Sequence, residues 1–202
     1  MTAGPPATFE AMPPSAPLLY LDYLDPVSFL VEIRVAALES GDGRSVERRP
    51  FEAVPPPAPL LSPTHPGWIE RWETAAEVAR EEGLELVRPP LLPWTRKAHE
   101  LALHAREKDR FEAVHGALFR AFHLEGRDLG RVDVLVDIAV EAGLDRTATR
   151  VVLDVDRHLE ELRSLRIDAE RRGVRGVPTI VAHGEVVEAP LDPSGLRDAL
   201  VP

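Results

Sequence analysis

The chain has 202 residues, enough for one ordinary domain or for a domain that carries a large insertion. Its net charge of −10, from 34 acidic and 24 basic residues, argues against a nucleic-acid-binding protein or a binder of anionic membranes, because both need a basic surface. The sequence contains no cysteine, which excludes disulfide bonds, thiolate nucleophiles and thiolate metal ligands.

Residues 1–16 are rich in proline and alanine and are expected to form a disordered lead-in. They contain neither the basic segment nor the continuous apolar segment of a signal peptide. No apolar run approaches the roughly 20 residues that span a bilayer. We therefore expect a soluble, cytoplasmic protein with no membrane partner.

The first predicted elements are a strand, a helix and a second strand. The apolar run 17–24, "PLLYLDYL", is typical of a buried strand. Apolar residues then recur at helical spacing over 26–38, and "SGDG" follows as a stop signal. Residues 45–54 favour a second strand, in which Pro50 indicates a sheet edge or a bulge. The proline-rich stretch 55–66 is predicted to be an extended loop.

A long helical block comes next. Its helices are predicted at 68–82, 96–108, 111–124 and 132–142, with one helix or two over 147–172. Residues 179–189 favour a hairpin around His183-Gly184, and a short last helix begins with Asp192 as its cap and Pro193 at its first position. The prediction is an α/β protein with 1–16 as lead-in, 17–62 and 148–202 as the two parts of the α/β domain, and 63–147 as an all-helical insertion.

Two segments together carry a family resemblance. "LDPVSF" (24–29) leads a strand into a helix that starts with proline, and "RGVPTIV" places Val177-Pro178 just before the hairpin. With "LPWTRKAHELALHA", "ALFRAFHLEGRDLG" and "DAERRGVRGVPTIV", the chain resembles thioredoxin-fold proteins of the DsbA family, in particular the FrnE-like branch of predicted dithiol-disulfide isomerases. The resemblance implies a thioredoxin-like α/β fold with a large helical insertion.

The family's reactive motif, Cys-Pro-x-Cys, matches Asp25, Pro26, Val27 and Ser28. Asp25 and Ser28 are thus the candidate catalytic positions, but neither can form a mixed disulfide. The resemblance also implies a cis bond before Pro178, which would leave the N–H and C=O of Val177 unpaired in a cleft beside Pro26. His99 and Trp94 are further candidates for the lining of that cleft.

A related branch, the kappa-class glutathione transferases and 2-hydroxychromene-2-carboxylate isomerases, uses a serine to hold the thiolate of glutathione. "YLDPVSFL" resembles that motif, with Asp25 where the serine would be. A carboxylate cannot donate a hydrogen bond to a thiolate and repels it by roughly 4 kcal/mol at about 4 Å. Ser28, three residues on, can supply a hydroxyl instead if its rotamer faces the loop of Pro178.

Structural explanations exist for the same residues. Asp followed by Pro is a favoured helix start, so Asp25 can be only a cap, and His99 can be an ordinary buried histidine. His99 and His104 are five residues apart rather than four, so no metal site is predicted.

Three functions remain open. The first is a protein that has lost dithiol chemistry and binds a peptide or small molecule in the cleft, without a cofactor and with a homodimer as a possible assembly. The second is a glutathione-dependent isomerase or transferase. The third is a structural subunit whose cleft is filled by its own side chains.

Overall fold

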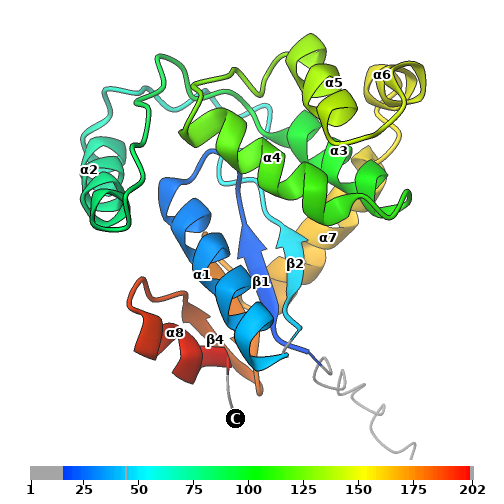
Figure 1. Ribbon diagram of the computed structural model, residues 1–202. Coiled ribbons are helices and arrows are strands. Elements are labelled where there is room, and N and C mark those ends of the chain that lie inside the picture. Colours follow the sequence, from blue (N-terminus) through cyan, green and yellow to red (C-terminus); the bar gives the residue numbers. More distant parts are fainter. Residues whose placement is uncertain (1–15, 44, 201–202) are drawn as a thin grey trace, which may run out of the picture.

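A four-stranded sheet forms the centre of the protein (Figure 1). The structure, a computed structural model, describes residues 16–43 and 45–200, so the lead-in predicted for 1–16 lies, apart from Ala16, outside the described residues. The strands are β1 (Leu18–Leu21), β2 (Glu47–Pro50), β3 (Thr179–Ala182) and β4 (Glu185–Glu188), in the order β2-β1-β3-β4. β1 runs parallel to β2 and antiparallel to β3, and β3 and β4 form the predicted hairpin.

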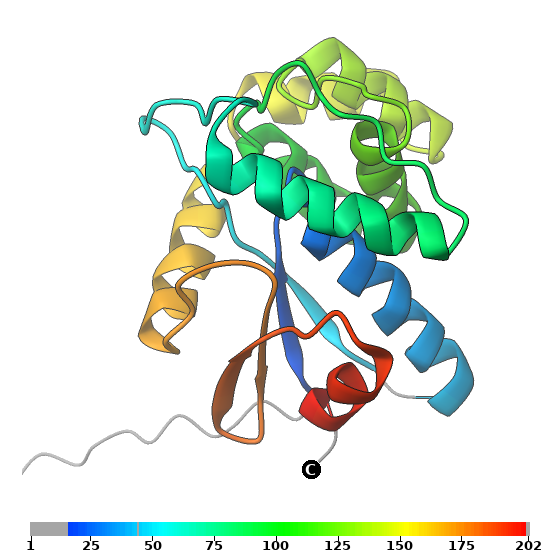
Figure 2. The same ribbon diagram turned by 90° about the vertical axis from the view of Figure 1, so that its left-hand side faces the viewer.

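β1 is apolar throughout because both faces of the sheet are covered. Leu19 and Leu21 face the core that contains α1 (Pro26–Asp42) and α8 (Pro193–Leu200). Leu18 and Tyr20 face a second cluster, which contains Ala169 of α7 (Leu159–Arg171). Figures 1 and 2 show α1 on one side of the sheet and α7 on the other. The predicted α/β architecture is confirmed.

The helical block lies over one end of the sheet (Figure 1). Its helices are α2 (Pro66–Glu81), α3 (Arg96–Arg106), α4 (Phe111–His123), α5 (Val132–Glu141) and α6 (Arg146–Asp154). α2 packs against α1, and α6 packs against α3 and α5. The block therefore continues to Asp154, and the predicted domain boundary at 147/148 falls inside α6.

Two elements differ from their predicted extent, and a third segment takes one of the two alternatives that the sequence left open. α1 runs on to Asp42 because Gly43, with φ 65°, takes the left-handed conformation that ends the helix and donates its N–H to the carbonyl of Glu39. β2 is only four residues long, and Pro50 lies at its end on the sheet edge. The segment 147–172 forms two helices, α6 and α7, separated by a turn in which Asp156 has φ 52°.

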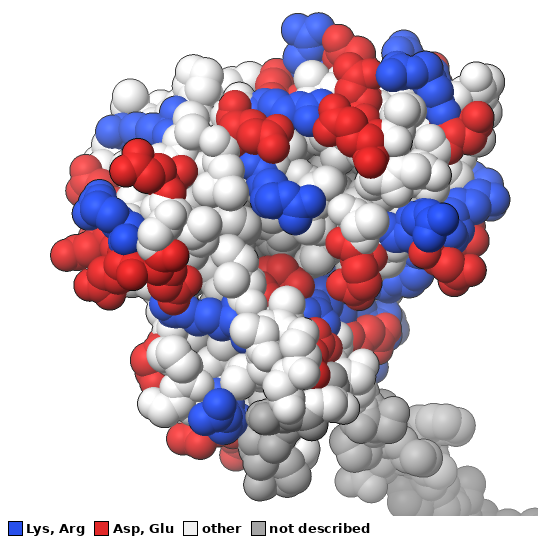
Figure 3. All heavy atoms as spheres, in the orientation of Figure 1, with Lys and Arg blue, Asp and Glu red and all other residues white. Residues whose placement is uncertain are grey.

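Charged side chains of both signs are interspersed over the face shown in Figure 3. A single-sign patch of the kind that attracts a polyanion is not visible among the described residues of that face. Within residues 16–43 and 45–200, no helix is both long and apolar enough to cross a membrane.

Candidate functional site

The site begins where β1 turns into α1. Asp25 caps the helix: its Oδ2 accepts hydrogen bonds from the Ser28 backbone N–H (2.7 Å) and the Ser28 hydroxyl (2.6 Å). Pro26 occupies the first turn, where no N–H is needed. Both Asp25 and Ser28 are buried. The Ser28 hydroxyl therefore points at Asp25 and is not available to a ligand as its donor.

A second side chain completes this arrangement from the helical block. Arg71 of α2 forms a two-pronged contact with Asp25, with Nε 2.5 Å from Oδ1 and Nη2 3.1 Å from Oδ2. The same Nη2 donates to the carbonyl oxygen of Val177 at 2.7 Å. One guanidinium thus joins α2, the start of α1 and the loop before β3.

The Arg71 guanidinium occupies a backbone group of the loop before β3 that was expected to be free for a ligand. The expected unpaired carbonyl of Val177 is not found, because Arg71 occupies it. The Val177–Pro178 peptide bond is cis, and the loop lies within hydrogen-bond reach of the group that binds Asp25. Burial alone would lower the pKa of Arg71, but the hydrogen bonds and charge of Asp25 raise it above its ordinary value. Arg71 is a permanent cation here.

A groove of about 550 Å³ lies beside this ion pair. It runs between the start of α1, one side of α2 and the segment after β4, and is lined by Val27, Gly67, Glu70, Arg71, Thr74 and Glu188–Leu191. A second hollow, of about 300 Å³, is lined by Val177 and Pro178 and shares Glu188 with the first. Volumes of this size are common for small-molecule sites.

Of the predicted site residues, Val177 and Pro178 line one of these hollows, whereas Asp25, Pro26, Ser28, His99 and Trp94 line neither. His99 is buried, with Nε2 3.4 Å from Asp22 Oδ1 and its ring 4.9 Å from that of Tyr23, and it lines a separate internal cavity of about 20 Å³. Trp94 is 40% exposed and donates its indole N–H to the carbonyl of Ala58 in the proline-rich loop. Arg71 thus connects Asp25 with the loop that carries Val177 and Pro178, whereas His99 and Trp94 lie outside both hollows.

Asp22, behind the turn, explains why His99 lies there. Its carboxylate is fully buried and accepts the Ala53 N–H at 2.6 Å. Burial by itself raises the pKa of Asp22, but the nearby His99 imidazole, the hydrogen bond from the Ala53 N–H and the Thr95 side chain outweigh it, so the pKa is lowered. The carboxylate holds the β1–α1 turn against the segment after β2, and His99 belongs to this support.

The fold and the sequence now agree on a family. The family model of the DSBA-like thioredoxin domain matches residues 18–201, almost the whole described chain. The chain belongs to the DSBA-like thioredoxin domain family. Within this family its motif positions hold Asp25 and Ser28 in place of cysteines, and the chain contains no cysteine elsewhere.

The chain is also similar to individual proteins and solved structures. The uncharacterized protein YwbO of Bacillus subtilis (strain 168) is 28% identical over 174 residues, which cover 84% of this chain and 87% of YwbO. The crystal structure of the probable DsbA oxidoreductase SCO1869 from Streptomyces coelicolor is similar with a TM-score of 0.75 at 25% identity, over 91% of this chain and 88% of that one. A 2-hydroxychromene-2-carboxylate isomerase is similar with a TM-score of 0.73 at 20% identity, over 85% and 87%.

Arg71 is the site residue that the sequence did not reveal. It lies 46 residues from Asp25 and 106 from Val177, so no local motif links the three. On a helix with many charged residues, one arginine that turns inward looks the same as those that face solvent. The usable signal was indirect, since a buried carboxylate at position 25 requires a partner.

Proposed function

We propose that this DSBA-like protein has no dithiol-exchange activity and instead binds a small molecule or a short peptide in the groove beside Arg71. The observation that carries the proposal is the Arg71 bridge from Asp25 to the Val177 carbonyl. It fills the position of the reactive dithiol with a closed ion pair and leaves a groove of about 550 Å³ next to it.

The same bridge indicates how a ligand binds. An extended peptide that pairs with the backbone of Val177 would have to displace Arg71 from that carbonyl. A ligand seated in the groove between Val27 and Thr74 does not meet this cost. We therefore favour recognition by the groove walls over strand-like pairing with the loop.

The charges of the walls narrow the ligand class. Glu70 and Glu188 are the two carboxylates of the lining, and its one guanidinium is already paired with Asp25. Glu188 lies 3.9 Å from Arg71 Nη1 and is 78% exposed at its side chain. Apolar contacts come from Val27, Pro190 and Leu191. This lining favours a neutral or amine-bearing ligand with an apolar part over a polyanion.

A blocking variant tests the proposal. Thr74 is exposed, lines the groove and lies one helical turn from Glu70, so Thr74→Arg fills the groove without disturbing the core. Glu77→Arg, one turn further along α2 on an exposed position, is the matched control. Short peptides and small amines, neutral compounds and acids are titrated, with binding followed by amide NMR shifts and the fluorescence of Trp68 and Trp72.

We expect at least one amine-bearing or neutral class to bind the unaltered chain and the Glu77→Arg control, and to lose binding to Thr74→Arg. Binding that Thr74→Arg leaves unchanged would place the ligand elsewhere. If no compound of the panel binds, the proposal is wrong. The Arg71–Asp25 ion pair then has a structural role only, as in a subunit whose cleft is filled by its own side chains.

The alternative is a glutathione-dependent isomerase or transferase. The similarity to a 2-hydroxychromene-2-carboxylate isomerase, which shows the fold, is the observation that favours it. Against it, the Ser28 hydroxyl donates to Asp25, so the donor that would hold a thiolate is already used. Retention on immobilised glutathione, together with turnover of a model electrophile, would establish this alternative over the first proposal.

A further inference from the structure

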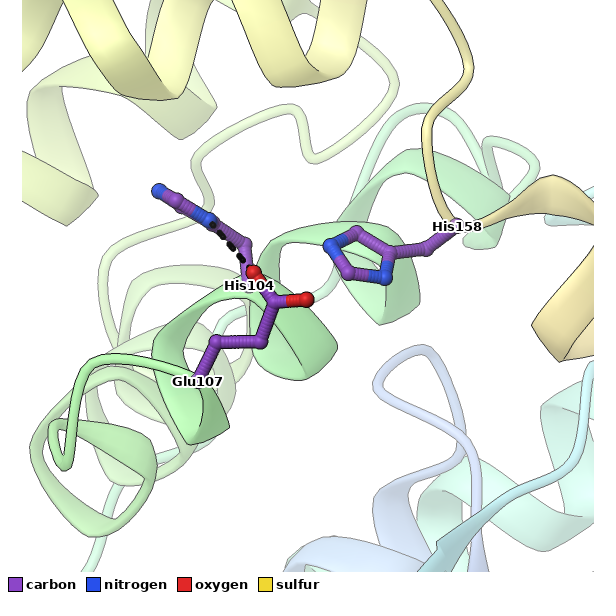
Figure 4. Close-up of side chains that lie close together, drawn as sticks. All are labelled: His104, Glu107 and His158. Atoms are coloured by element: carbon purple, nitrogen blue, oxygen red, sulfur yellow. Dashed lines mark ion pairs between the residues drawn. The ribbon is translucent and has the colours of Figure 1, made fainter.

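A group of nitrogen and oxygen atoms gathers away from the groove, where α3 ends and α7 begins. His104 is in the last turn of α3, Glu107 follows that helix directly, and His158 precedes α7. One ligand atom from each of the three lies within 4.8 Å of the others. Figure 4 shows the carboxylate of Glu107 between the two imidazole rings.

Both imidazoles are buried, each with 3% of its residue surface exposed. Nδ1 of His104 and Nε2 of His158 have no hydrogen-bond partner among residues 16–43 and 45–200. A buried nitrogen that lacks a partner costs about 1–3 kcal/mol, so such atoms in a folded protein call for an explanation. In Figure 4 the unpaired nitrogens face the Glu107 carboxylate, so one shared ligand can satisfy them both.

Glu161 prepares His158 for this role. Its Oε2 lies 3.0 Å from Nδ1 of His158 and accepts the N–H there. In a neutral imidazole that bond places the proton on Nδ1 and leaves the lone pair on Nε2, the atom that faces the cluster. A carboxylate behind a ligating histidine is the usual support of protein metal sites.

The turn that carries His158 is also held in place from α3. The Lys97 ammonium contacts the Leu153 carbonyl and the Asp156 carboxylate, and the backbone N–H of His158 donates to Glu100 at 3.4 Å. Because His104 is on the same helix as Lys97 and Glu100, these contacts fix the two histidines relative to one another.

From this geometry we propose that His104, Glu107 and His158 form a binding site for a divalent transition-metal ion of the zinc class, with Glu161 as the supporting carboxylate. Two imidazoles and one carboxylate are ligands that suit zinc. In a tetrahedral zinc site with bonds of about 2.0–2.1 Å, ligand atoms lie about 3.4 Å apart. His104 Nδ1 and Glu107 Oε2 are 3.8 Å apart, so a small side-chain rotation closes this pair.

A neighbouring positive charge, that of Arg157, affects how a metal ion can bind to Glu107. Arg157 Nη2 is 3.1 Å from Glu107 Oε2 and competes with a metal for that carboxylate. The Arg157 side chain is 51% exposed and can move into solvent. The metal therefore displaces an arginine on binding.

The test measures Zn²⁺ binding by calorimetry and the visible spectrum of Co²⁺ bound in its place. The unaltered chain is expected to bind one ion and to give the intense visible bands of tetrahedral Co²⁺. Glu107→Gln, at an exposed position that does not endanger folding, should weaken binding at least 10-fold, and His158→Gln should do the same. Circular dichroism checks that each variant is folded.

Three further variants separate a built site from chance binding. Glu161→Gln should weaken Zn²⁺ binding by about 10–100-fold through the orientation of His158. Glu160→Gln, on the same helix with a side chain 80% exposed, is the control and should change nothing. Arg157→Gln should tighten binding. Equal affinities in the unaltered chain, Glu107→Gln and His158→Gln, or no binding of Zn²⁺, would overturn the proposal and leave a water molecule as the occupant.

Discussion

At residue 25 the chain keeps the electrostatics of a DSBA-like active site but changes the group that uses them. The start of α1 offers free backbone N–H groups and the positive end of the helix dipole, which stabilise any anion placed there. In this protein the anion is the Asp25 carboxylate, held further by Ser28 and Arg71. A carboxylate, which cannot form a mixed disulfide, stands at the position where the family motif has a cysteine.

A cysteine at position 25 should make the electrostatic potential at the start of α1 measurable. A thiol introduced by Asp25→Cys lies at the helix start beside the Arg71 guanidinium, so its pKa should fall well below the ordinary 8.5. Ser40→Cys, in the exposed last turn of the same helix, should give a thiol near 8.5. The ultraviolet absorbance of the thiolate against pH reports both values. Equal pKa values in the two variants would show that the field at residue 25 is absent.

Arg71→Met should destabilise the protein by about 1–3 kcal/mol, because the buried Asp25 carboxylate loses two of its donors and the Val177 carbonyl loses one. The cost is at the lower end if water reaches Asp25 through the partly exposed position of Arg71. Urea unfolding measures it. Arg80→Met, exposed near the end of α2, serves as the control and should stay within about 0.5 kcal/mol of the unaltered chain.

At the scale of elements, α1 and β2 are joined by a buried ion pair. Arg48 of β2 contacts both carboxylate oxygens of Glu32, at 2.9–3.2 Å, and also pairs with Glu39. Burial raises the pKa of Glu32, but the charges and hydrogen bonds of His115 and Arg48 outweigh it and lower the pKa below its ordinary value. The edge strand is thus anchored to the helix by charge as well as by its backbone.

Arg48→Leu should therefore cost about 3–5 kcal/mol, since it leaves two carboxylates without their shared cation. The neighbouring Arg49 pairs with the more exposed Glu47, so Arg49→Leu should cost no more than about 1 kcal/mol. The free energy of unfolding in urea compares the two variants. A loss in Arg48→Leu no larger than that in Arg49→Leu would mean that water already screens the Glu32 pair.

Local sequence signals predicted most elements and their order, because a helix cap or an alternating apolar run acts within a few residues. Asp25 and Asp192 cap α1 and α8 as predicted. What depends on distant partners was not predictable. Arg71 turns inward only because α2 packs on α1. His104 and His158, 54 positions apart in the sequence, come together only because the chain turns at Asp156 between α6 and α7, so no helical spacing links them.

At the scale of the whole molecule, one buried histidine ties the helical block to the sheet domain. His123, the last residue of α4, donates from Nε2 to the Tyr23 carbonyl at 3.0 Å, in the turn between β1 and α1. It is stacked against Phe29 and almost fully buried. Burial lowers the pKa of His123 to about 3, although the Tyr23 carbonyl and the charge of Asp22 both raise it.

This depressed pKa makes folding sensitive to acid. Above pH 6.5, His123 is neutral in the folded and unfolded states and adds no pH dependence. Between pH 6.5 and about 3 the unfolded chain binds a proton that the folded chain does not, so stability falls as the pH falls. The slope is about 1.4 kcal/mol per pH unit, up to about 5 kcal/mol in total. The lowered pKa values of Asp22 and Glu32 act in the same direction at lower pH.

His123→Gln isolates the histidine from those carboxylates, because glutamine can donate to the Tyr23 carbonyl but does not titrate. Urea unfolding from pH 7 to pH 4 should show a shallower loss of stability in this variant, by about 1 kcal/mol per pH unit through most of that range. His65→Gln, at an exposed position before α2, should follow the unaltered chain. If His123→Gln and the unaltered chain give parallel curves, water reaches the imidazole and the contact between block and sheet is looser than its burial indicates.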